Sequence, residues 1–190
     1  LEHVYADLPE MIRRWKAREI SEADYAEYVM KRAILTPTLK GAETINNLVS
    51  TQYLPNQAPT TSLAADAAVG EQGDRPDETI PPELLHTLTL SGMPPHSLEL
   101  REGGVYLLLR TLDLSQGLCN GTRLVLTRST RYTLTFIVAT QGPFLGHEAL
   151  IPRIAMTATD SGLSFQLQRI QFPVVPAWGM TINKSQGQTL

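Results

Sequence analysis

The sequence predicts an α/β domain that is interrupted by a small inserted β-barrel. Apolar residues recur with helical spacing in the first fifty positions, and the period changes to two between about residues 82 and 168. A nearly continuous apolar run then returns at residues 172–182. The chain has 190 residues, of which 42% are hydrophobic and 18% charged, as in globular proteins. This length accommodates one domain and a smaller additional unit.

Composition excludes several classes of protein. No apolar run reaches the roughly 18 residues of a membrane-spanning helix, and the first residues contain no signal-peptide core. The net charge of −3 argues against a strongly basic coat for nucleic acid, although a local basic groove is compatible with it. The single Cys119 excludes an internal disulfide and fits a reducing compartment.

Residues 1–54 are predicted to form the first part of the α/β domain. An apolar stripe at i, i+3, i+4 and i+7 predicts a helix through Leu8, Met11, Ile12 and Trp15. Ser21, with Asp24 three positions later, predicts the start of a second helix. Residues 33–38 indicate a short buried strand that Pro37 ends, and a further helix is expected over residues 42–49.

The middle of the chain divides into two parts. Residues 55–81 are poor in large apolar side chains and rich in acidic ones, which predicts an acidic linker or loop. Residues 82–168 contain four or five short alternating segments and a tight-turn signal at Asn120-Gly121. Closure into a barrel removes exposed strand edges, so we expect a barrel here rather than an open sheet. Residues 169–190 are then predicted to return to the α/β domain.

The last nine residues, INKSQGQTL, place a lysine beside a serine and a glycine. They do not form a phosphate-binding loop, because Trp178 and Asn183 stand where that motif requires glycines. Ser185 and Gln188 match a capping box, which predicts a helix that starts at Ser185 and is cut by the end of the chain. Lys184 beside such a helix start could attract phosphate, but residue pattern alone favours an ordinary turn with a solvated lysine.

Other candidate groups are weaker. The four histidines are scattered and accompany one cysteine, so no metal-ligand spacing is present and no metal site is predicted. Arg123 and Arg131 flank the strands after the Asn-Gly turn and could contact a nucleic-acid backbone. Arginines on a barrel are more often a solvated face.

Five blocks in order resemble one known family. They are RAILTPT…INNLV, PPELLHTLTLSGMPPHSLEL, LLLRTLDLSQGLCNGTRLVL, LIPRI and QFPVVPAWGMTINKSQGQTL. From about Lys31 to Leu190 the sequence resembles the C-terminal half of Pif-type (petite integration frequency) DNA helicases, especially the copies carried by Helitron-like transposons. Residues 1–30 match only loosely.

The resemblance implies a superfamily-one, 5′→3′, ATP-dependent DNA helicase. Its second RecA-like domain, of the P-loop-NTPase type but lacking the P-loop, would be interrupted by an SH3-like barrel of the 2B type. The resemblance implies these DNA-facing residues: Thr36, Thr38, Thr181, Asn183, Lys184 and Ser185. Gln186 and Gly187 would couple the DNA site to the nucleotide. ATP and Mg²⁺ would be bound mainly by residues of the parent outside this chain, and the partners would be single-stranded and forked DNA.

The pathway and the location follow from the resemblance only as broad expectations. Repair, recombination, telomere maintenance and transposition all use this type of helicase. The nucleus is the expected location, with the mitochondrion as an alternative.

Departures from the family pattern leave alternatives open. Leu39 replaces the asparagine of TPTN, and Gly104-Val105 replaces Ala-Pro in a barrel strand. The phosphate loop, the magnesium motif and the final arginine motif have no match here, so we expect no ATP hydrolysis by this chain alone. The alternatives are a non-catalytic nucleic-acid-binding module and a decayed transposon remnant.

Overall fold

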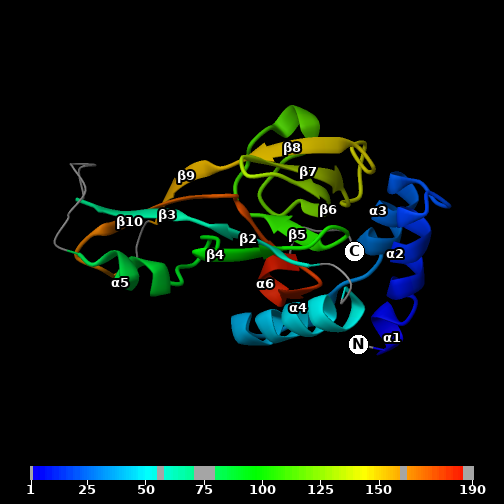
Figure 1. Ribbon diagram of the computed structural model, residues 1–190, viewed down its shortest axis with the longest axis horizontal. Coiled ribbons are helices and arrows are strands. Elements are labelled where there is room, and N and C mark those ends of the chain that lie inside the picture. Colours follow the sequence, from blue (N-terminus) through cyan, green and yellow to red (C-terminus); the bar gives the residue numbers. More distant parts are fainter. Residues whose placement is uncertain (1, 55–57, 71–79, 159–161, 186–190) are drawn as a thin grey trace.

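The structure is a computed structural model that describes residues 2–54, 58–70, 80–158 and 162–185 (Figure 1). Its helices are α1 (Glu2–Tyr5), α2 (Leu8–Lys16), α3 (Glu22–Met30), α4 (Leu39–Tyr53), α5 (Pro82–Thr87) and α6 (Ile182–Ser185), with one 3₁₀ turn at Leu114–Gln116. Its strands are β1 (Ile34–Thr36), β2 (Thr60–Leu63), β3 (Ala65–Val69), β4 (Ser97–Leu100), β5 (Val105–Leu108), β6 (Arg123–Ser129), β7 (Thr133–Val138), β8 (Glu148–Pro152), β9 (Ile154–Thr157), β10 (Gln166–Gln171), β11 (Val174–Pro176) and β12 (Gly179–Thr181).

The two predicted N-terminal helices are confirmed. Leu8 and Ile12 of α2 are buried, as the apolar stripe requires. Ser21 caps α3: its hydroxyl oxygen accepts from the Asp24 backbone N–H at 3.1 Å, and the Asp24 carboxylate accepts from the Ser21 N–H at 2.9 Å. This reciprocal capping box explains why α3 begins immediately after Ser21.

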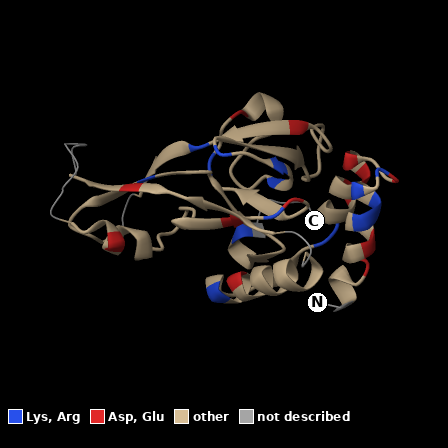
Figure 2. Ribbon diagram, in the orientation of Figure 1, with Lys and Arg blue, Asp and Glu red and all other residues tan. Residues whose placement is uncertain are grey.

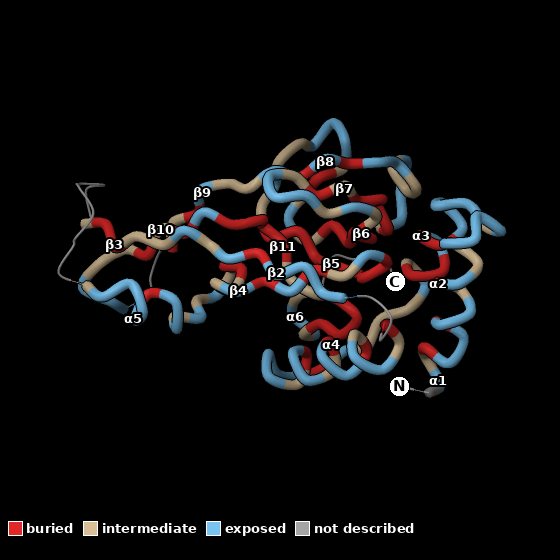
Figure 3. The backbone as a smooth tube through the Cα atoms, in the orientation of Figure 1, coloured by how far each residue is buried: buried red, intermediate tan, exposed pale blue. Residues whose placement is uncertain are grey.

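A five-stranded sheet in the order β11-β5-β6-β7-β8 lies at the centre of the molecule. Alternate residues of β5 enter two different cores: Val105 and Leu107 pack with the N-terminal helices, whereas Tyr106 and Leu108 pack inside the curved sheet. Figure 3 shows this sheet as largely buried backbone between more exposed helices and loops. Burial on both faces explains why β5 reads as an uninterrupted apolar run.

Closure into a barrel is not seen among the strand pairings of the described residues. Each neighbouring pair of the sheet is antiparallel, but the pairings leave β11 and β8 as its two ends. The coarse expectation of a mixed α/β chain therefore holds. The inner face of the sheet is nevertheless covered, because Leu98 and Leu100 of β4 pack into the same core.

The predicted linker at residues 55–81 is wrong for its described central part. That part forms β2, which pairs with β4, and β3, which pairs with β10. The sequence did not indicate these strands, because Ala65, Ala67 and Ala68 have a low intrinsic propensity for β structure. Neighbouring strands, rather than local propensity, hold this segment extended.

The apolar run near the C-terminus is two strands rather than one. β11 extends the five-stranded sheet, while β12 pairs in parallel with β1. The return to α/β structure therefore begins at Gly179 and not at residue 169, which lies within β10. Within the described ranges, no helix has both the length and the apolarity needed to cross a membrane.

Candidate nucleic-acid interface

The parallel pair β1–β12 brings two distant sequence blocks to one edge. Thr36 is the register partner of Thr181, although the two are far apart in the chain. Because both strands run in the same direction, the segments that follow them, at Pro37-Thr38 and at Ile182, leave from the same edge. Carboxyl ends of parallel strands are the usual place for ligand sites in α/β folds.

The threonines after β1 mainly shape the start of α4. Thr38 caps this helix by accepting from the Gly41 N–H at 3.1 Å, and its side chain is exposed. Thr36 is only 6% exposed, and its hydroxyl donates to the Thr38 carbonyl at 2.7 Å. The expectation that Thr36 faces DNA is therefore wrong for this structure, because its polar group is already engaged inside the turn.

Helix α6 follows β12 without an intervening loop and contains Asn183 and Lys184. The prediction of a helix start at Ser185 is wrong, since the helix begins at Ile182. The helix starts directly after the paired strand β12, and this position had more influence on its first residue than the local capping box at Ser185. Ser185 ends the described part of α6, whereas Gln186 and Gly187 lie outside the described residues.

A cavity of about 450 Å³ separates α6 from the loops of the five-stranded sheet. Asn183 and Lys184 form one wall. The other walls come from the loops before β6 and after β7, with the polar side chains Asn120, Thr122, Thr140 and Gln141. Amides, hydroxyls and one cation are groups that contact the sugar-phosphate backbone and base edges of nucleic acids.

Tight local structure holds the loop before β6 in place. Gly117 and Gly121 have φ of +71° and +95°, and a Cβ at Gly117 would lie 2.5 Å from the Phe144 ring. The Thr122 hydroxyl donates to the Gly117 carbonyl at 2.8 Å and accepts from the Cys119 N–H at 3.1 Å. The GLCNGT block thus forms a rigid wall of the cavity. The sequence predicted only a tight turn at this position.

Arg123 does not contribute to a surface. Arg123 is only 2% exposed, and its guanidinium donates to the carbonyls of Val29 at 3.0 Å and Ala177 at 3.3 Å. Burial lowers the pKa of Arg123, because the charged form is removed from water. The expectation that Arg123 contacts nucleic acid is wrong, since the guanidinium is enclosed between α3 and the segment before β12.

Arg131 is exposed at the turn between β6 and β7. Its guanidinium carbon lies 5.4 Å from the ring centre of Tyr132, which is 68% exposed. The length of β6 separates this turn from the cavity by on the order of 20 Å. Arg131 therefore belongs to a separate exposed patch that does not join the cavity.

Figure 2 shows lysine and arginine spread over helices and strands, with acidic residues among them on the N-terminal helices. Arg13 illustrates this mixing, because it pairs with both Glu10 and Glu19. Among the described residues that line the cavity, Lys184 is the one with a full positive charge. Any nucleic-acid contact here would depend on a local cation rather than on a basic face.

Part of the chain is similar in sequence to known DNA helicases. Residues 83–128 match the family model of the 2B domain of the DNA helicase Pif1. The ATP-dependent DNA helicase PIF6 of Trypanosoma brucei brucei is 31% identical over 102 residues, which is 49% of this chain and 12% of that relative. This chain thus spans about an eighth of the relative's length.

Solved structures share the fold. Pif1 helicase from Candida albicans has a TM-score of 0.56 at 21% identity, over 84% of this chain and 37% of that one. Bacteroides Pif1 bound to single-stranded DNA has a TM-score of 0.56 at 20% identity, over 84% and 33%. The fold is that of the solved Pif1 helicases, and residues 83–128 match the 2B domain of that family. Together with the relative PIF6, these matches support a Pif1-type helicase fragment.

Proposed function

We propose that this chain supplies single-stranded DNA contacts to an ATP-dependent 5′→3′ DNA helicase and couples them to ATP hydrolysis. The observation that carries the proposal is the meeting of the GLCNGT and TINKS blocks across one cavity, whose lining includes the side chains of Asn120, Asn183 and Lys184. Support comes from a relative named as an ATP-dependent DNA helicase and from a solved neighbour bound to single-stranded DNA.

One strand of DNA would lie along the edge formed by β1 and β12. Thr38, Thr181, Asn183 and Lys184 would contact its backbone, with Ser185 at the end of this row. Asn120 and Gln141 would face the strand from the opposite wall of the cavity. Lys184 would provide the charge attraction, and the amides would set the position of the strand without reading its sequence.

The remaining assignments extend this proposal to the parent protein. The β1–β12 part would belong to the second RecA-like domain, and the five-stranded sheet would be its SH3-like 2B insertion. Gln186 and Gly187 would report the nucleotide state, while residues outside this chain would bind ATP and Mg²⁺. A solved neighbour holds ADP-AlF4, and another is described at forked double-stranded DNA, which supports ATP and forks as ligands.

The test measures binding of a fluorescein-labelled oligo-dT to the 190-residue chain by anisotropy at several salt concentrations. We expect Lys184→Ala to weaken binding and to reduce the salt slope by about 0.7, the value for one phosphate contact to a single strand. Lys16→Ala is the matched control, because it removes the same charge from α2.

Equal salt slopes for Lys184→Ala and the unchanged chain would show that Lys184 makes no phosphate contact and is an ordinary solvated side chain. The parent protein provides the second half of the test, since Lys184→Ala should there reduce DNA-stimulated ATP hydrolysis. Normal DNA-stimulated ATP hydrolysis in a variant that has lost DNA contacts would show that these contacts are not coupled to ATP hydrolysis.

A further inference from the structure

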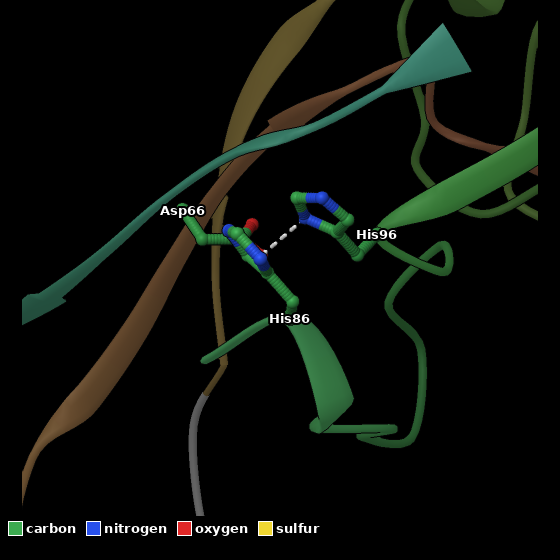
Figure 4. Close-up of side chains that lie close together, drawn as sticks. All are labelled: Asp66, His86 and His96. Carbon is green, nitrogen blue, oxygen red and sulfur yellow. Dashed lines mark hydrogen bonds and ion pairs between the residues drawn. The ribbon is translucent and has the colours of Figure 1, made fainter. Parts of the chain in front are cut away.

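Two histidines that the sequence separates lie side by side in the extension formed by β3, β9, β10 and α5. His86 belongs to α5, His96 directly precedes β4, and Asp66 belongs to β3 (Figure 4). Each of the three residues places one potential metal-binding atom within 4.8 Å of such an atom of the other two. The sequence interpretation of scattered histidines missed this convergence, because spacing along the chain does not show it.

Hydrogen bonds from Arg169 hold the carboxylate of Asp66 in place. Its side chain is fully buried and accepts two hydrogen bonds from Arg169, at 2.7 Å to Nε and 2.8 Å to Nη2. Arg169 is buried as well and also donates to the carbonyls of Leu85, Leu88 and Pro94. The guanidinium charge is thus neutralised by Asp66, so it presents no net repulsion to a cation bound on the other side of the carboxylate.

His96 is oriented by Asp66. Its Nδ1 lies 2.8 Å from the Asp66 Oδ2, and its side chain is 14% exposed. An ionised carboxylate only accepts hydrogen bonds, so Nδ1 is the donor in this contact and Nε2 is the His96 nitrogen left to bind an ion. Histidines that bind zinc usually donate their other ring N–H to a carboxylate in this way, which orients the ring.

His86 provides the second nitrogen. Its ring centre lies 3.7 Å from that of His96, and the planes meet at 27°. His86 is exposed, so its ring can turn toward a shared ion without displacing core residues. The two imidazoles come from different elements, which means that an ion between them would tie α5 to the segment before β4.

We propose that His86 and His96 bind a zinc-type divalent ion through their imidazole nitrogens, with Asp66 as the carboxylate that orients His96. Water would complete the coordination. Imidazole ligands suit Zn²⁺, Co²⁺ or Ni²⁺, whereas Mg²⁺ and Ca²⁺ prefer oxygen, so this ion is distinct from the Mg²⁺ of ATP hydrolysis. Binding would stabilise the extension, because the folded form alone brings the two rings together.

The experiment titrates the metal-free 190-residue chain with ZnCl₂ against a chromogenic chelator, and with CoCl₂ while the visible absorption is recorded. We expect one ion per chain, no competition from millimolar Mg²⁺, and an affinity at least about tenfold lower for His86→Ala. His147→Ala is the matched control, since His147 is an exposed histidine next to the five-stranded sheet. Imidazole NMR signals of His86 and His96 should shift with Zn²⁺ while that of His147 does not.

Several results would overturn the proposal: no binding, equal affinity of His86→Ala and the unchanged chain, or an equal loss in His147→Ala. His86 is exposed, so its replacement tests the ligand without removing part of the core. Oligo-dT affinity should be unchanged in His86→Ala, which keeps the outcome of this experiment separate from that of Lys184→Ala.

Discussion

Two buried arginines illustrate how differently one residue type can be accommodated. Arg169 has a buried carboxylate partner and carbonyl acceptors. Arg123 instead interacts with carbonyls and with the Tyr5 hydroxyl, and its Nε has no hydrogen-bond partner within the described structure. An uncompensated buried cation is costly, so Arg123 must be retained by the packing and hydrogen bonds it provides. Both residues hold separate segments of the fold together through hydrogen bonds to backbone carbonyls.

Arg123→Ala should therefore lower stability rather than DNA affinity. Loss of a large buried side chain and two carbonyl partners should cost about 2–4 kcal/mol in urea unfolding. Arg131→Ala is the exposed counterpart and should leave stability within about 0.5 kcal/mol. Weaker oligo-dT binding by a fully stable Arg123→Ala chain would contradict its buried position.

Asp66 should make stability depend on acid. Burial opposes ionisation of this carboxyl, but the hydrogen bonds from Arg169 and His96 outweigh it, so the pKa of Asp66 lies below its ordinary value of 3.8. The unfolded chain then binds the proton more readily than the folded chain. The stabilisation is present above pH 3.8 and is lost as the pH falls through the lower folded pKa.

Urea midpoints between pH 7 and pH 3 measure this effect. Asp66→Asn should lower stability at neutral pH by about 3–5 kcal/mol, because it leaves Arg169 buried without a counter-charge. The same variant should lose less stability between pH 5 and pH 3 than the unchanged chain does. An identical acid dependence in both chains would assign the acid sensitivity to other carboxyls.

At the scale of elements, the contact of α4 with β12 sets the edge that carries the candidate site. Asn46 of α4 accepts from the Gly179 N–H at 2.8 Å and donates to the carbonyls of Pro176 and Gly179 at 3.0 and 3.1 Å. A Cβ on Gly179 would lie 2.8 Å from the Ile45 Cγ2. The helix thus rests directly on the backbone of β12.

Gly179→Ala should push α4 away from β12 and destabilise the chain by about 1–3 kcal/mol. Thermal unfolding of this variant, alone and combined with Ile45→Ala, provides the check. The second substitution removes the Ile45 Cγ2, the nearest atom to the new methyl group, and keeps the Cβ at 3.0 Å, so the two changes together should cost less than their sum. Simple additivity would show that the close approach has no energetic consequence.

At the scale of the whole molecule, most buried apolar side chains of the described residues belong to three clusters of unequal size. The two larger clusters lie on opposite faces of the five-stranded sheet. The smallest lies in the extension and consists of Ala68, Leu85, Met93, Met156, Ala158 and Leu167, with partly buried neighbours. Figure 1 shows this extension projecting away from the sheet and the N-terminal helices.

Hydrogen exchange should reveal this division. Amides of β3, β9 and β10 should exchange faster than those of β5, β6 and β7, because a smaller core gives a lower free energy of local opening. Mass spectrometry of peptides after timed labelling measures the difference. Equal protection throughout would show that the extension unfolds only together with the rest of the chain.

Local pattern was a sound guide at the two N-terminal helices, although the capping box at Ser185 predicted the start of α6 wrongly. The capping box at Ser21 and the stripe of α2 were predicted correctly, since capping and amphipathicity act within a few residues. The strands β2 and β3 were missed because alanine and threonine become strand residues only beside a partner. The burial of Arg123 was missed for a similar reason, because an arginine shows its acceptors only after α3 has packed against the sheet.

The sequence by itself determined a mixed α/β chain and, through its ordered motifs, the likeness to Pif1-type helicases. Only the tertiary structure decided that Asn183 and Lys184 share a cavity with Asn120, and that His86 meets His96 over Asp66. The physical reason is the range of the forces involved. Helix caps and strand alternation depend on near neighbours in the chain, whereas sites form where strand pairing and core packing bring distant segments together.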